Sequence, residues 1–196
     1  MLGDYDNQEF RKVVVRDFSR AINIITKYQS KKELIMKTKT IITDITQEDL
    51  VNLLSTALSG SDYFGADYDS NEYRKIPNPD DCECFEEKLA KMLLNGKTIT
   101  ISDAYVEDEE DFHGDLWHEW DNESSTMDYT INLENIKKGL QKCIDGTFKE
   151  NEGCGDEKSY MRKCVNDLMY EDSMELDLYE AENIMQIIVF GELVYG

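Results

Sequence analysis

The apolar segment QIIVFGELVYG, residues 186–196, most constrains what this chain can fold into. It lies in a sequence of formal charge −21 and has a single carboxylate of its own. An apolar run in so acidic a chain is expected to be buried. We expect a helix over 177–190 that stops at the following glycine, where a left-handed residue needs no Cβ. The next residues should return to the core with Val194 buried, and Gln186 and Glu192 should have partners or line a site.

Hydrophobic periodicity predicts an α+β fold, with a small antiparallel sheet packed against several helices. Strands are expected where Ile99 and Ile101 alternate with polar residues and over 127–131. Other helices are expected between Thr46 and Gly60, from Phe85 to Asn95, after Asn132, and through Tyr160 to Met169. The stretches 61–84 and 145–158 are rich in turn-forming residues and are expected to be loops.

Charge divides the chain into two parts of opposite sign. Residues 1–40 have nine Lys or Arg against five Asp or Glu, whereas residues 41–196 have 12 basic and 37 acidic residues. An amphipathic pattern over 6–30 predicts a helix. We therefore expect a basic helical N-terminal extension over 1–35, followed by a single acidic α+β domain over 36–196.

Composition narrows the classes of partner. The acidic part repels nucleic acid and anionic lipid and attracts basic protein surfaces. No apolar run is long enough to span a membrane, and no secretory leader is recognisable. The five cysteines are irregularly spaced, which favours reduced thiols and a cytoplasmic location.

Motifs for catalysis and metal binding are weak. The stretch 67–78 imitates a calcium loop, but Glu72 stands where glycine is needed and Asn78 where the bidentate Glu is needed. The spacing of Cys82 and Cys84 is not the usual zinc spacing. We expect no catalytic residues, no metal and no cofactor.

The acidic stretch EDEEDFHGDLWHEWDNE, residues 107–123, is the candidate partner-binding surface. Tryptophan flanked by carboxylates is typical of an interface that faces a basic protein. The alternative is a solvated hairpin with both tryptophans tucked beneath it. The candidate residues are Glu107, Asp108, Glu109, Glu110, Asp111, Asp115, Trp117, Glu119, Trp120 and Asp121.

The aromatic stretch SDYFGADYDSNEY, residues 61–73, is a second candidate site. Aromatic residues beside glycines can form a stacking pocket for a planar ligand. The alternative is that they fill the core as the chain leaves the preceding helix. The candidate ligand-binding residues are Tyr63, Phe64, Tyr68, Gln186 and Glu192.

Four stretches resemble a family of small acidic proteins of phages, prophages and gut-bacterial mobile elements, whose members end in Q-x-x-x-F-G-E-x-V-x-G. They are ITQEDLVNLLSTALSGSDYF, LLNGKTITISDA, YTINLENIKKGL and DLYEAENIMQIIVFGELVYG. The matching residues include Tyr63, Phe64, Gly96, Asp103, Leu133, Gly139, Asp177, Gln186, Phe190, Gly191, Glu192, Val194 and Gly196. The resemblance implies an accessory phage gene, a class rich in inhibitors of host immunity.

Three functions follow from charge and resemblance. The leading hypothesis is a non-enzymatic counter-defence protein whose carboxylates imitate DNA phosphates and bind a basic groove of a host defence protein. A homo-oligomer is left open. The second is a sponge that sequesters a nucleotide-derived immune signal. The third is a structural or house-keeping phage protein.

Overall fold

The structure is a computed structural model that describes residues 42–106, 113–149, 157–170 and 176–195. The residues 41–196 form one compact unit, an α+β fold with a four-stranded antiparallel sheet and six helices in its described part. The strands are β1 (Phe64–Asp67), β2 (Ile99–Asp103), β3 (His118–Asp121) and β4 (Thr126–Ile131). The helices are α2 (Gln47–Leu58), α3 (Ser70–Tyr73), α4 (Phe85–Leu94), α5 (Leu133–Asp145), α6 (Glu157–Tyr170) and α7 (Leu178–Val189).

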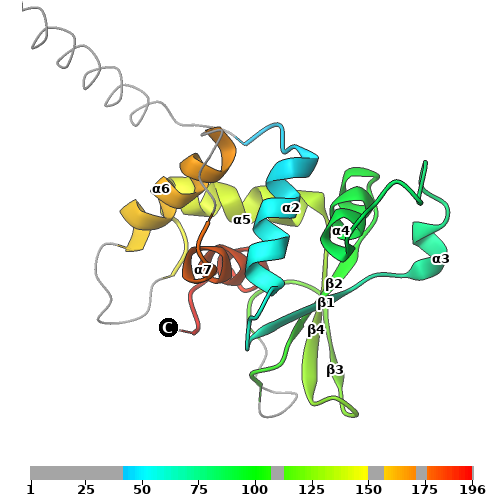
Figure 1. Ribbon diagram of the computed structural model, residues 1–196. Helices are drawn as coiled ribbons and strands as arrows, with labels where there is room; N and C mark the ends of the chain where they lie inside the picture. The colour runs from blue at the N-terminus through cyan, green and yellow to red at the C-terminus, as the bar shows by residue number, and fades with distance from the viewer. Residues whose placement is uncertain (1–41, 107–112, 150–156, 171–175, 196) are drawn as a thin grey trace, which may run out of the picture. The chain divides into compact units, whose positions relative to one another are not determined.

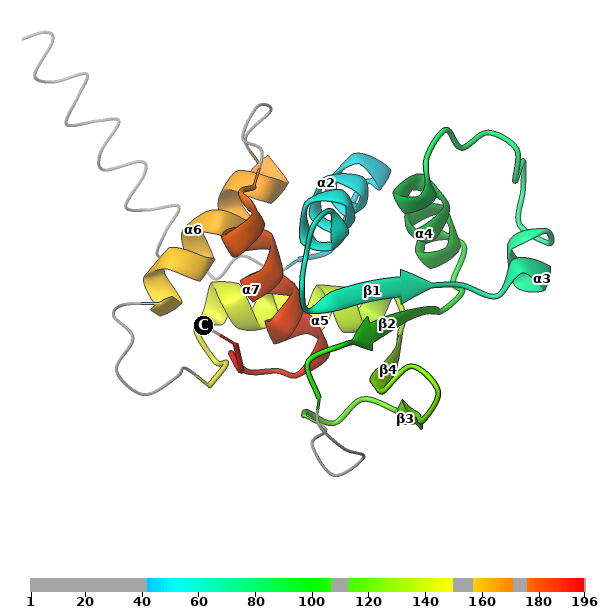
Figure 2. The same cartoon turned by 60° about the horizontal axis from the view of Figure 1, so that its bottom comes forward.

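The helices among the described residues cover one side of the sheet. Its strand order is β1-β2-β4-β3, which Figure 2 shows in sequence across the sheet, and α2, α4, α5 and α7 lie together on one side in Figure 1. Strand alternation turns Ile99 and Ile101 of β2 toward these helices, with Tyr129 and Ile131 of β4 beside them. The opposite face carries polar residues and is not covered by the described helices.

Helices α5 and α7 approach each other closely. A Cβ added to Gly139 of α5 would lie 2.5 Å from the Cα of Ile188 on α7. Only glycine allows the two backbones to approach to this distance. From Ala181 to Val189, α7 is buried at every position except Glu182, which makes this part of the helix the centre of the core.

The expected helix starts are confirmed. Thr46, Asn132 and Asp177 each accept a backbone hydrogen bond at the start of α2, α5 and α7, and each forms a reciprocal capping box. The end of α7 is also as expected, because Gly191 follows the helix at φ +78°. The expected burial of Val194 is wrong in detail: Leu193 is buried, and Val194 is half-buried.

The expected loop over 61–84 is also wrong. It contains the edge strand β1, which pairs with β2 from Phe64↔Asp103 to Asp67↔Thr100, and the short helix α3. A four-residue strand leaves too little alternation in the sequence to be recognised, and its pairing with β2 is a tertiary contact.

The expected extension over 1–35, and the candidate residues Glu107, Asp108, Glu109, Glu110 and Asp111, lie outside the described residues. No helix in the described ranges is both long and apolar enough to cross a membrane.

Candidate functional site

The uncovered side of the sheet carries carboxylates from three strands. Opposite one another across the sheet lie Gly65, Ser102, Asp128 and Glu119, contributed by β1, β2, β4 and β3 in that order. Side chains directly opposite each other in antiparallel strands have Cβ atoms about 5 Å apart. Asp128 and Glu119 therefore form a close pair of like charges, an arrangement that would be relieved by a cation.

The acidic surface extends along both edges of the sheet. Asp121 lies two residues beyond Glu119 on β3, and Asp67 lies at the end of β1 on the same side. None of the four strands contains Lys or Arg. We call Asp67, Glu119, Asp121 and Asp128 the acidic face.

Local hydrogen bonds fix the charge on this face. The Asp121 carboxylate accepts from the Ser124 hydroxyl at 2.6 Å and from the Glu123 N–H at 2.9 Å. These bonds, that of Ser124 first, lower the pKa of Asp121 from its usual value. Asp128 has one oxygen, Oδ1, that is buried and has no hydrogen-bond partner in the described structure. Asp128 thus keeps an acceptor that its described neighbours do not use.

The two tryptophans of the acidic stretch lie in different surroundings. Trp117 is 64% exposed, and its carbonyl accepts from the Thr130 N–H at 3.0 Å, so it continues β3 at the edge of the sheet. Trp120 packs against the core, and its indole N–H donates to Asn122 at 2.6 Å. Of the candidate partner-binding residues that the structure describes, Trp117, Glu119 and Asp121 share the uncovered side, and Asp115 is exposed just before β3. Asp67 and Asp128 were missed because only the register of β1 and β4 places them there.

The second set of candidate residues is gathered only in part, since Tyr63, Phe64 and Gln186 all contact the segment 190–195. The Tyr63 ring stacks on Tyr195, with centroids 4.8 Å apart, and Phe64 is buried against Phe190. Tyr68 lies elsewhere, beside Tyr73 and Phe85. Glu192 forms an ion pair with Lys149 at 2.6 Å. Because Tyr195 already covers one face of the Tyr63 ring, these aromatics pack against the chain itself.

Gln186 and Asp103 hold the segment after α7 in place. The Gln186 Oε1 accepts from the N–H groups of Val194 and Tyr195 at 2.7 and 2.8 Å. The buried Asp103 carboxylate accepts from the Tyr195 hydroxyl at 2.6 Å and from the Tyr105 N–H at 3.0 Å. Gln186 thus has the partners that the sequence predicted for it. Tyr195 links Gln186 to Asp103, because its backbone bonds the one and its hydroxyl bonds the other, and this link could not be predicted from the sequence.

The thiols of Cys143 and Cys164 are poorly suited to nucleophilic chemistry. Burial raises the pKa of Cys143, and burial together with Glu180 raises that of Cys164 to about 12. Both therefore stay protonated at neutral pH. Among the described residues, no group of three or more His, Cys, Asp or Glu is arranged to hold a metal ion.

No family model, no curated protein and no solved structure matches this chain. The arguments about its function therefore rest on its own residues.

Proposed function

We propose that this chain is a binding protein whose acidic face engages a basic surface of a partner protein. The observation that carries the proposal is the set of carboxylates from three strands on one uncovered sheet face, with no Lys or Arg in any of the strands. The excess of acidic residues over 41–196 strengthens the field around this face.

Trp117 adds an exposed aromatic contact to the carboxylates of the proposed face. Exposed tryptophan is enriched among residues that dominate binding energy, and its ring attracts Lys and Arg side chains through cation–π contacts. Since Trp117 stands beside β3 at an open edge, a partner can reach it and the carboxylates together. Carboxylates two residues apart on β3 are separated by about 6.8 Å, a regular spacing of negative charge.

The resemblance to phage accessory proteins gives this proposal a biological setting. In that setting the partner is a host defence protein, and the carboxylates stand in for the phosphates of its nucleic acid. The nucleotide-sponge hypothesis would require Tyr195 to leave the Tyr63 ring. It predicts a rise in melting temperature with a nucleotide-derived ligand, which a thermal-shift panel measures.

The test compares two variants of equal charge. Glu119→Gln, Asp121→Asn and Asp128→Asn together remove three of the four charges of the acidic face. As a control, Asp44→Asn, Glu48→Gln and Asp81→Asn neutralise as many exposed carboxylates outside the sheet. The probe is a fluorescent oligo-arginine peptide, titrated at about 0.05 and 0.5 M salt.

We expect the face variant to bind the peptide at least about tenfold more weakly than the control variant, because a tenfold loss needs only about 1.4 kcal/mol over three charges. High salt should weaken the wild type strongly. Equal losses in the two variants would mean that net charge alone attracts the peptide, and the proposed face would be wrong. A host protein captured by the wild type should likewise be lost with the face variant and kept with the control.

A further inference from the structure

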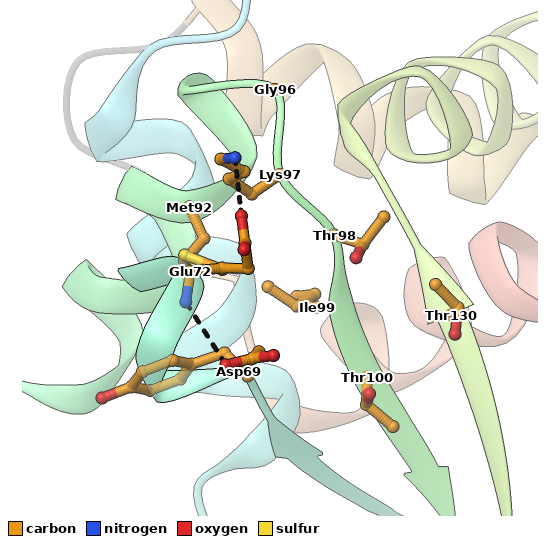
Figure 3. Close-up of a pocket in the computed structure, with 10 residues that line it drawn as sticks. Asp69, Glu72, Met92, Gly96, Lys97, Thr98, Ile99, Thr100 and Thr130 are labelled. Carbon is orange, nitrogen blue, oxygen red and sulfur yellow. Dashed lines mark hydrogen bonds and ion pairs between the residues drawn. The ribbon is translucent and has the colours of Figure 1, made fainter. Parts of the chain in front are cut away.

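A cavity of about 390 Å³ lies where β1 ends and α3 begins (Figure 3). Its volume is within the range of small-molecule sites. The proposed partner-binding face does not account for it, although Thr100 and Thr130 border both. The lining residues are Tyr68, Asp69, Glu72, Met92, Gly96, Lys97, Thr98, Ile99, Thr100 and Thr130.

The cavity forms because β1 ends before it has paired with the whole length of β2. The last pair between these strands is Asp67↔Thr100, so no residue of β1 lies opposite Thr98. The Ala104 N–H donates to Tyr63, which shows that even-numbered residues of β2 direct their peptide groups toward β1. Thr98 comes directly before β2 and lines the cavity, at a position where β1 offers no paired residue.

The side chains add both donors and acceptors. Hydroxyl groups come from Thr98, Thr100 and Thr130, and Figure 3 shows the Asp69 carboxylate across the opening from Thr100. One oxygen of Asp69 is held by the N–H groups of Asn71 and Glu72, at 2.7 and 3.3 Å, which fixes the orientation of the carboxylate. The cavity therefore offers a preorganised set of polar groups.

The cavity also has an apolar wall, formed by Tyr68, Met92 and Ile99. Met92 and Ile99 are each 1% exposed and lie behind the cavity surface, so the apolar side chain that a ligand can contact is Tyr68, which is half-buried against Tyr73 and Phe85. A ligand that fits must present an apolar face on one side and hydrogen-bonding groups at its rim.

The charges at the cavity are balanced locally. Glu72 bonds Lys75 and, at 2.8 Å, Lys97. These bonds, that of Lys75 first, lower the pKa of Glu72 to about 2, so it stays ionised and both ammonium groups are paired with it. When the Asp69 carboxylate is added to these three side chains, the cavity has no net positive charge that would hold an anion. A cation is disfavoured as well, because the two lysine ammonium groups repel it.

We propose that this cavity binds a neutral sugar ring with vicinal hydroxyl groups. The C–H face of the ring packs on Tyr68, and its hydroxyls exchange hydrogen bonds with Asp69, Thr98 and Thr100. Two kinds of ligand contain such a ring, a free hexopyranose and a nucleoside with its ribose. The cavity is large enough for the sugar ring of either.

The test is an NMR titration of the ¹⁵N-labelled full chain. The probes are methyl glucopyranoside, methyl galactopyranoside, methyl mannopyranoside and adenosine, with cyclohexanol as a ring that has no vicinal hydroxyls. We expect the amide signals of Lys97, Thr98 and Thr100 to shift with at least one sugar probe and to remain fixed with cyclohexanol. A shift with adenosine alone identifies ribose as the source, and a shift with a pyranoside identifies a free sugar.

Variants separate the cavity from the rest of the sheet. Thr100→Val keeps the shape and β-propensity of the residue, and Asp69→Asn keeps the acceptor oxygen that caps α3. Each should weaken binding about tenfold, since each leaves a ligand hydroxyl without its partner. Ser102→Ala removes a hydroxyl from the same strand outside the cavity and should leave the affinity unchanged.

Two results would overturn the proposal. One is the absence of any localised shift with all four sugar probes, and the other is an equal response to cyclohexanol. Neither result bears on the acidic face, because the oligo-arginine titration changes carboxylates that do not line the cavity.

Discussion

At the scale of single residues, the side-chain amide of Gln186 takes the place of a strand partner. It bonds the N–H groups of Val194 and Tyr195 through one oxygen, and its nitrogen donates to Asn183 and to the Tyr195 carbonyl, both at 3.2 Å. Gln186 is only 2% exposed, so water cannot replace these bonds.

Replacing Gln186 with alanine should therefore be costly. Two backbone N–H groups lose their acceptor and a cavity opens in α7, which together should lower the free energy of unfolding by about 2–4 kcal/mol. Urea denaturation measures the loss, and Glu182→Ala on the same helix is the control, since Glu182 is not part of the buried face. Similar losses for both variants would show that helix content, and not the buried amide, matters.

Asp103 makes stability depend on pH. Burial raises the pKa of its carboxyl above the usual 3.8, against the opposing effect of the Tyr195 hydrogen bond. The folded state thus holds the proton more tightly than the unfolded chain, and the free energy of unfolding falls as pH rises from about 4 through the folded pKa.

Asp103→Asn removes this titration and keeps an acceptor for Tyr195. We expect the stability of the wild type relative to this variant to fall as pH rises from about 4 and to level off once the folded pKa is passed. Urea unfolding of both proteins between about pH 4 and pH 8 measures the difference. A difference that grows with pH would mean that the Tyr195 bond outweighs the cost of burial.

At the scale of elements, the contact between α5 and α7 depends on Gly139. Gly139→Ala should lower the free energy of unfolding by at least about 2 kcal/mol, although alanine is the better helix former. The reason is that the added Cβ meets the backbone of Ile188 as well as its side chain. Lys138→Ala, at an exposed position beside it, is the matched control. If Gly139→Ala raised the unfolding midpoint, the close approach of the two helices would be disproved.

The elements differ in how much of them could be predicted. Helices α2, α5 and α7 have capping residues and buried positions at helical spacing, so their starts follow from local chemistry. The strand β1 has only four residues, and its sequence resembles a loop. Similarly, half of the acidic face comes from Asp67 and Asp128, which are far from the acidic stretch in sequence and join it only through strand pairing.

At the scale of the whole molecule, the four stretches that carry the family resemblance meet around α7. Phe64 contacts Phe190, Asp103 accepts from Tyr195, and Gly139 lies against Ile188. These residues therefore have packing roles in the structure. The proposed binding face uses other residues.

The charge of residues 41–196 should also limit stability. With 37 acidic and 12 basic residues, folding brings like charges together, and salt screens their repulsion. We expect the melting temperature to rise between about 0.02 and 0.5 M NaCl at neutral pH. The same series near pH 4, where many carboxylates are protonated, should show a much smaller rise. A melting temperature indifferent to salt at neutral pH would contradict this expectation.

The sequence by itself determined the α+β class, the capped helices, the glycine that ends α7 and the acidic character of the protein. Each follows from spacing, capping chemistry or composition, which act over a few residues. Only the tertiary structure decided which strands pair, and therefore which carboxylates share a face, which tryptophan is exposed and where a shortened strand leaves a cavity. Strand register is set by contacts between residues far apart in the chain, so no local pattern contains it.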